Sequence, residues 1–400
     1  MFWKALTERV KVMAPPTVAP NGIPVGTTPT AIGLDAVRNI LYVANFGSNN
    51  VSVIDAARDT VTATIPVGRL PSGVDQVDVG GNSRVFVSNF GSNNVTVLDG
   101  KTNQVITTIP VGRSPTSVVA WAAGPDNPTP LVFVTNGDDN TVTPIDATTN
   151  STLTPLSLTG RLPLAAAINR RTSLIYVVTS ASDSVNVIDG HAFFQVNANP
   201  FRPIITGVPG GFALDVDEGR NRVYVADAPG GMTVIDGNIG RAITRVPVGN
   251  GPDGVAFNPN TSHIFVANAV DDTVSVLNAS DLTERPITLH VGRGPRGMVL
   301  APGNKIYVAN GNDNSVSVIR DSRSDPMMTG LVTPAPSALA PLGITHLLQT
   351  PAGVVYLRPS TPGNQAALAL TALVTRPAVV SGLAPDQRVP LLIVTSVQVQ

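Results

Sequence analysis

The chain has 400 residues and a formal net charge of −1, and only 13% of its residues are charged. This balance provides no basic field for nucleic acid or an anionic membrane, so neither is expected as a partner. Cysteine is absent, which excludes disulfides, thiolate metal sites and covalently attached c-type haem. Aromatic residues make up 4% of the chain against 42% for all hydrophobic residues, so the core must consist mainly of valine, isoleucine, leucine and alanine.

Residues 1–19 are predicted to be an N-terminal extension. Charged side chains interrupt Met1–Val10 before an apolar stretch of signal-peptide length develops, so no signal peptide is expected. The longest weakly polar run, Ala366–Val374, is soon ended by Arg376 and is too short to span a bilayer as a helix. No transmembrane segment is expected.

From residue 20 to residue 320 one phrase recurs: an apolar residue, an aromatic residue, valine, a small residue, then asparagine or a near equivalent. The copies occupy residues 41–45, 85–89, 132–136, 175–179, 223–227, 264–268 and 306–310. Successive aromatic positions are separated by 44, 47, 43, 48, 41 and 42 residues. A period of about 40 to 50 residues is typical of one four-stranded propeller blade. The seven copies therefore predict an all-β chain with a seven-bladed β-propeller over residues 20–320.

Each copy also predicts the remaining strands of a blade. An alternating strand such as Val51–Asp55 follows the aromatic strand, and an outer strand such as Ile65–Gly68 follows that. The seventh copy has no outer strand after Arg320, but Ile23–Gly26 at the start of the chain has the missing pattern. The N-terminal strand is therefore predicted to close the ring, which leaves no blade without a neighbour.

The phrases Tyr42–Asn45 (Tyr-Val-Ala-Asn), Val51–Asp55 (Val-Ser-Val-Ile-Asp) and Ile65–Arg69 (Ile-Pro-Val-Gly-Arg) resemble the YVTN family of β-propeller repeats, which includes archaeal surface-layer proteins. The resemblance covers about residues 20–320, and copies four and five depart furthest, with Thr179 in place of the asparagine. It implies an extracellular or cell-surface location and interaction roles. A minority of relatives are enzymes or cofactor-assembly proteins.

Four arginines, Arg69, Arg113, Arg161 and Arg293, each follow the glycine that ends an outer strand. In a propeller this loop and the polar turns share one face, so the arginines are candidates for binding an anion or an acidic partner. The alternative is that they pair with the acidic turns beside them.

Those acidic turns contain Asp138–Asp139, Asp271–Asp272 and Asp313. Aspartate favours such backbone shapes, and weak calcium binding is the alternative, although no twelve-residue calcium loop follows. The four histidines, His191, His263, His290 and His346, have no ligand spacing. No metal site and no cofactor are predicted.

Asp75 lies in a predicted innermost strand, aligned with the small residues Gly33, Ala213 and Ala256 of other copies. A carboxylate at the central channel suits catalysis or metal binding. Because Asp75 is a single unpaired candidate, it is taken as a channel residue and no catalytic residue is assigned.

Residues 321–400 form a C-terminal extension rich in proline and alanine, with strand-like stretches at Val354–Leu357 and Leu391–Val394. They are predicted either to cover the ring or to form an interface module through which the protein binds partners or assembles with itself. Low charge and abundant aliphatic residues do not fit a disordered tail.

These features favour a non-enzymatic structural or interaction propeller of a surface or extracellular assembly. In this interpretation the ring is the scaffold and the C-terminal segment docks to neighbours. The alternative is a channel-centred enzyme similar to lactonase or quinoprotein-like propellers, and a tetrapyrrole- or redox-linked propeller is a third.

Overall fold

The chain divides into two compact units, Thr17–Arg320 and a second unit made of Met1–Pro16 with Asp321–Gln400. The structure is a computed structural model, and it describes residues 7–12, 16–124, 127–193, 195, 199–228, 230–321, 327–334, 346–350, 353–359, 370–374 and 391–398.

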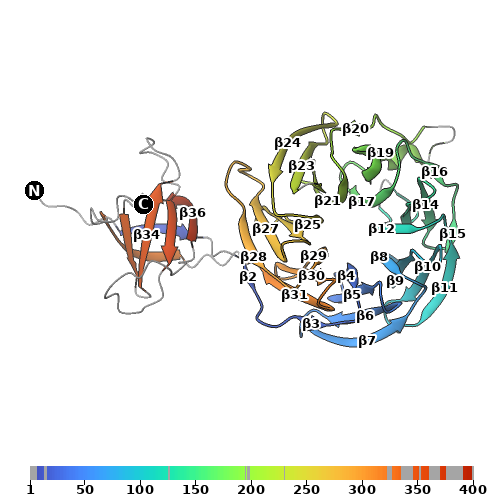
Figure 1. Ribbon diagram of the computed structural model, residues 1–400, viewed down its shortest axis with the longest axis horizontal. Coiled ribbons are helices and arrows are strands. Elements are labelled where there is room, and N and C mark those ends of the chain that lie inside the picture. Colours follow the sequence, from blue (N-terminus) through green and yellow to red (C-terminus); the bar gives the residue numbers. More distant parts are fainter. Residues whose placement is uncertain are drawn as a thin grey trace, which may run out of the picture. The chain divides into compact units, whose positions relative to one another are not determined.

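Within Thr17–Arg320 the described strands form seven antiparallel sheets arranged as blades around a central axis (Figure 1). The predicted all-β, seven-bladed propeller is confirmed. The helical elements in the described part of the chain are the single-turn α1 (Gly190–Phe193) and a 3-10 turn at Ser180–Ser182. None of the described helices has the length and apolar character needed to cross a membrane.

The blades follow one another in chain order, each beginning with its innermost strand. Blades one to three contain β4 (Pro29–Asp35), β5 (Ile40–Asn45), β6 (Asn50–Asp55), β7 (Thr60–Pro66), β8 (Pro71–Val79), β9 (Asn82–Asn89), β10 (Asn94–Asp99), β11 (Val105–Pro110), β12 (Pro115–Trp121), β13 (Leu131–Asn136), β14 (Thr141–Asp146), β15 (Ser151–Thr152) and β16 (Leu156–Ser157). Blades four to six contain β17 (Pro163–Asn169), β18 (Leu174–Thr179), β19 (Ser184–Asp189), β20 (Ile205–Thr206), β21 (Gly211–Asp217), β22 (Arg222–Asp227), β23 (Gly231–Asp236), β24 (Arg241–Pro247), β25 (Pro252–Asn258), β26 (His263–Asn268), β27 (Thr273–Asn278) and β28 (Ile287–His290). Blade seven contains β29 (Pro295–Ala301), β30 (Lys305–Asn310), β31 (Ser315–Arg320), β2 (Thr17–Val18) and β3 (Ile23–Pro24).

The repeated aromatic residue joins each blade to the next. All seven aromatic side chains are at most 1% exposed. In blade one, Tyr42 packs in a cluster with Val85, Val87 and Leu98 of blade two, and its hydroxyl donates to the carbonyl of Gly100 at 3.1 Å. A large apolar side chain with a satisfied hydroxyl is suited to such a boundary.

The ring is closed by the N-terminal strands, as the sequence predicts. β2 and β3 both pair with β31, with Ile23 opposite Val316. Ile23 is 6% exposed and joins a hydrophobic cluster with residues of blades one and seven. Both ends of the propeller unit therefore meet in one blade.

The asparagine of the repeated phrase is buried and organises the polar end of each blade. Its Nδ2 donates to a hydroxyl on the next strand in five blades, through the pairs Asn45–Ser52, Asn89–Thr96, Asn136–Thr143, Asn268–Ser275 and Asn310–Ser317. In blade four the two positions are reversed, with the hydroxyl on the aromatic strand and the asparagine on the next strand. Here Nδ2 of Asn186 donates to the hydroxyl of Thr179 at 3.2 Å. In blade five Asp227 accepts from Thr233 and Arg245 instead. The divergent copies keep a polar link with different residues.

The second unit contains the strands β1 (Thr7–Val12), β32 (Met327–Pro334), β33 (His346–Thr350), β34 (Gly353–Pro359), β35 (Leu370–Val374) and β36 (Leu391–Gln398). Its described strands pair in this order and close on themselves, since β1 pairs with both β32 and β36. Residues from both ends of the chain therefore share one sheet, which the sequence does not predict.

Candidate functional site

The four arginine loops and the polar turns lie together at one end of the ring, which we call the loop face. In each case a backbone N–H of a polar turn donates to the arginine carbonyl. The pairs are Gly91–Arg69, Asp138–Arg113, Ala181–Arg161 and Asn312–Arg293. The predicted proximity of these loops holds in all four places.

Two of the arginines are held by acidic turns. Asp139 accepts hydrogen bonds from the backbone N–H of Arg113 at 2.7 Å and from its Nε at 2.6 Å, and Asp313 binds Arg293 in the same way at 2.6 Å for both. The backbone and guanidinium donors together lower the pKa of both carboxyl groups. These two charges are largely compensated within the protein.

Arg69 and Arg161 occupy the same loop position but meet serine where the other two meet aspartate. Their backbone N–H groups donate to the hydroxyls of Ser92 at 2.8 Å and Ser182 at 3.0 Å. Among the residues that the structure describes, neither guanidinium has a hydrogen-bond or ion-pair partner. Of the four candidate arginines, these two are free to bind something else.

Each free arginine is followed by a leucine in the left-handed backbone region, Leu70 with φ 52° and Leu162 with φ 57°. The same position holds Ser114 and Gly294 after the paired arginines. Left-handed backbone costs a non-glycine residue about 1–2 kcal/mol. Leu162 is nevertheless 40% exposed, so burial of its side chain offsets little of this conformational cost. Ser114, after the paired Arg113, has the same conformation with φ 53°, so the left-handed backbone belongs to the loop and does not distinguish the free arginines.

The loop face carries further apolar side chains. Phe46 and Phe90 lie with ring centroids 6.2 Å apart, and their backbone N–H groups bond to the loop residues Thr28 and Leu70. Phe212, at the start of β21, is 42% exposed. Guanidinium groups and apolar side chains therefore share this surface.

The innermost strands β4, β8, β12, β17, β21, β25 and β29 enclose a channel with a volume of about 800 Å³. In every blade the register shifts after the first residue of the innermost strand. A bulge of this kind re-aims the side chain it carries. The channel mouth is consequently lined by a ring of unlike residues: Thr30, Ser72, Thr116, Leu164, Phe212, Asp253 and Arg296.

This ring of residues is asymmetric. On one side Ser72 and Thr116 donate to the carbonyls of Pro115 at 2.7 Å and Pro163 at 2.8 Å in the following blade. On the other side Asp253 faces Arg296 with 3.7 Å between Oδ2 and Nη1. Burial raises the pKa of Asp253 to about 6, and Arg296 partly opposes that rise.

Deeper in the channel the structure corrects the sequence alignment of Asp75. Asp75 pairs with Phe86, so its equivalents are the residues opposite the aromatic position of each blade. In blade five that residue is Asp215, which pairs with Tyr224, whereas Ala213 pairs with Ala226. Asp75 is therefore one of two equivalent carboxylates.

The sequence alignment misses Asp215 because it places Ala213 at this position. Counting back from the aromatic residue finds it, since Asp215 precedes Tyr224 by nine positions, as Gly33 precedes Tyr42. The turn between the two strands has the same length in both copies, so the spacing is preserved.

Asp75 and Asp215 are held in the same way. Asp75 accepts from the N–H of Gln76 at 2.8 Å and, across the blade boundary, from that of Ala120 at 2.8 Å. Asp215 accepts from the N–H of Val216 at 2.7 Å and that of Phe257 at 2.8 Å. Burial raises the pKa of both carboxyl groups, that of Asp215 to about 6. Neither carboxylate forms an ion pair with a described residue.

The acidic turns and the strand histidines have structural partners. Asp138 accepts from the hydroxyl of Ser114 at 2.6 Å, and Asp271 accepts from both the backbone N–H and Nδ2 of Asn250. His263 and His290 lie at the ends of strands β26 and β28. In the described part of the chain, no group of three or more histidine, aspartate or glutamate side chains is placed to hold a metal ion.

No protein-family model matches this chain, and no curated protein matches it. Among solved structures, hydrazine synthase from Kuenenia stuttgartiensis is similar, with a TM-score of 0.62 over 74% of this chain and 97% of the other. The two share 20% sequence identity, so the similarity shows the fold alone.

Proposed function

We propose that this protein is a non-enzymatic interaction scaffold of a surface or extracellular assembly. The propeller holds the loop face rigid, that face binds an acidic protein partner, and residues 321–400 dock to neighbouring molecules. The surface location follows from the resemblance of the repeats to the YVTN family. The arrangement of the loop face supports the binding role.

The observation that carries the proposal is the uncompensated charge of Arg69 and Arg161. In the equivalent loops an aspartate binds Arg113 and Arg293 and neutralises their charge. The same position beside Arg69 and Arg161 holds a serine, so their charge is not neutralised. A free guanidinium beside a leucine, half-buried at Leu70 and exposed at Leu162, suits a carboxylate flanked by apolar residues.

A binding experiment with poly-glutamate as an acidic probe tests this surface. We expect the double variant Arg69→Gln/Arg161→Gln to lose about tenfold or more in affinity, because charge-assisted hydrogen bonds contribute about 1.5–3 kcal/mol each. The matched variant Arg113→Gln/Arg293→Gln is expected to change affinity little, since those side chains are already paired. Equal losses in the two double variants would indicate a general charge effect and contradict the proposal.

The assembly role is tested by the solution mass of the full chain beside residues 17–320 alone. We expect the full chain to form oligomers and the ring alone to be monomeric. Monomers in both cases would remove the docking role of residues 321–400 and leave the loop-face role to stand on its own binding test.

The two channel carboxylates favour an enzyme as the second candidate. A carboxyl group with a pKa near 6, as for Asp215, is suited to accept and return a proton near neutral pH. Hydrolysis of simple lactones by the purified protein, lost in Asp215→Asn, is the result that this candidate requires.

A further inference from the structure

Asp75 and Asp215 are not required by the propeller architecture. The same position is occupied by residues without a charge in the other five blades: Gly33, Val119, Ala167, Ala256 and Val299. Those blades form the same antiparallel pattern, with the outer strand split in two in blades three and seven, and pack against their neighbours without a carboxylate. The fold therefore does not require a carboxylate at this position, although each aspartate accepts a backbone N–H from the next blade.

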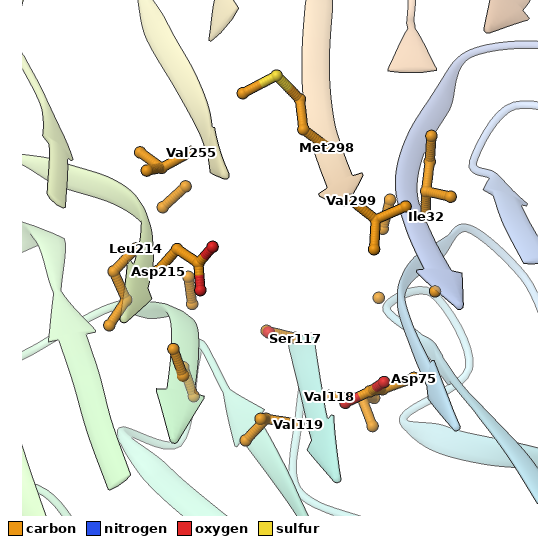
Figure 2. Close-up of a pocket in the computed structure, with 18 of the residues that line it drawn as sticks. Ile32, Asp75, Ser117, Val118, Val119, Leu214, Asp215, Val255, Met298 and Val299 are labelled. Atoms are coloured by element: carbon orange, nitrogen blue, oxygen red, sulfur yellow. The ribbon is translucent and has the colours of Figure 1, made fainter. Parts of the chain in front are cut away.

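Both carboxylates lie at the wall of the channel, on opposite sides of its open space (Figure 2). Each oxygen accepts one backbone N–H, which fixes its direction and leaves further acceptor capacity. Both carboxylates are half-buried and form no ion pair with a described residue, so they lose part of their hydration, and the backbone dipoles offset only part of that loss.

The cationic side chains that line the channel are already engaged elsewhere. Arg170 pairs with Glu218 at 3.5 Å, and Arg296 faces Asp253 at 3.7 Å. Among the described lining residues, no other lysine or arginine is present. Arg170 acts on both carboxylates through space, which slightly opposes the rise in their pKa that burial causes. It forms no ion pair with either, so a cation in direct contact with Asp75 and Asp215 would have to come from a ligand.

We propose that the channel binds a linear organic dication, a diamine or polyamine, with one ammonium group at Asp75 and another at Asp215. An ammonium group donates hydrogen bonds and carries the charge that each carboxylate lacks. A compact metal ion cannot reach carboxylates on opposite walls, and no third ligand group accompanies either one among the described residues.

The rest of the wall suits the carbon chain that joins two ammonium groups. The surfaces between the two aspartates are mixed, with aliphatic side chains from Ile32, Val118, Val119, Leu214, Val255 and Val299 set among polar groups such as Ser117. The volume of about 800 Å³ lies within the range of small-molecule sites. Methylene groups against aliphatic side chains and ammonium groups at the two ends match this lining.

Calorimetric titration of the full chain with spermidine tests the site. We expect binding at pH 8 that weakens about tenfold or more in Asp75→Asn and again in Asp215→Asn, because each variant removes a charge-assisted contact. The matched variant Asp281→Asn, at an exposed turn where the carboxylate accepts from Thr283, is expected to bind as the wild type does. Butylamine, with one ammonium group, is expected to bind much more weakly than spermidine.

A second measurement needs no variant. Lowering the pH of the wild type from 8 to 5 is expected to weaken spermidine binding, since protonation removes the charge of Asp215. Binding that persists in Asp75→Asn/Asp215→Asn, equal binding of butylamine, or no detectable binding at pH 8 would each overturn the proposal. Arg69→Gln/Arg161→Gln is expected to keep the binding, so this result and the loop-face result are independent.

Discussion

One residue in a polar turn decides whether the neighbouring arginine is available. Arg113 and Arg69 occupy equivalent loops, and both present a backbone N–H to the turn. Asp139 accepts that N–H and also holds the guanidinium, whereas Ser92 accepts only the N–H. The backbone is the same, but the charge exposed on the loop face differs.

Ser92→Asp therefore places a carboxylate where it can bind Arg69 as Asp139 binds Arg113. We expect poly-glutamate affinity to fall about as far as in Arg69→Gln, although the guanidinium is still present, with a change in stability of about 0–1 kcal/mol, as is usual for an exposed pair. Binding and thermal unfolding measured on both variants check this. Unchanged affinity in Ser92→Asp would mean that the free charge of Arg69 is not what the acidic probe recognises.

The carboxyl group of Asp215 gives a pH dependence with a defined sign. Because its folded pKa is raised from 3.8 to about 6, the folded state binds this proton more tightly than the unfolded chain does. Its contribution to stability is therefore greatest below about pH 4, falls as the pH rises to about 6, and is constant above that. We expect the stability of the wild type relative to Asp215→Asn to fall over this interval, as urea unfolding at each pH would show.

Asp139→Asn is the control with the opposite sign. The pKa of Asp139 is lowered, so its contribution is present above pH 3.8 and is lost in acid. A difference between wild type and Asp215→Asn that stays constant from pH 4 to pH 7 would contradict the buried, unpaired state of Asp215.

At the level of the element, five of the seven blades have a glycine that packs on the buried asparagine. The glycine that ends the preceding outer strand lies against the asparagine amide, as Gly112 does against Asn136. A Cβ at Gly112 would come within 2.6 Å of Asn136 Cγ. The recurring glycine is therefore explained by close approach, since no positive φ is recorded for it.

Gly112→Ala is expected to destabilise the ring by about 1–3 kcal/mol, because the asparagine must move and its bond to Thr143 must weaken. Gly124→Ala is the matched control, because a Cβ there meets nothing within 4 Å. Denaturant midpoints of the two variants make the comparison. Equal midpoints would show that the asparagine can shift without loss.

At the scale of the whole molecule, stability depends on a short closing contact. β3 contributes only Ile23 and Pro24 to the pairing with β31, yet it completes the outer edge of blade seven. A ring without this contact leaves the last blade incomplete beside the first.

Ile23→Asp is expected to lower the free energy of unfolding by about 3 kcal/mol or more, because it buries an unpaired charge in the closing cluster. Val61→Asp, on the exposed outer strand β7, is expected to change stability by less than about 0.5 kcal/mol. Chemical unfolding measures both, and limited proteolysis shows whether blade seven is the part that opens. If both variants unfold at the same midpoint, ring closure by β3 contributes little.

The all-β class, the seven blades and their closure by Ile23–Pro24 can all be predicted from the sequence. These follow from local pattern: a spaced aromatic phrase, alternating strands and an outer strand displaced to the start of the chain. Such features are encoded within a blade or between neighbours, so periodicity is enough to reveal them.

Which residues occupy equivalent positions in the blades, and which side chains contact one another, depends on the tertiary structure. Asp215 rather than Ala213 is the equivalent of Asp75, Arg69 and Arg161 are free while Arg113 and Arg293 are paired, and β1 joins β32 and β36. Register depends on the length of each turn and on bulges, and side-chain partners come from the next blade or from the other end of the chain. Those contacts are distant in sequence, so the repeat pattern fixes the architecture while the folded contacts select the chemistry.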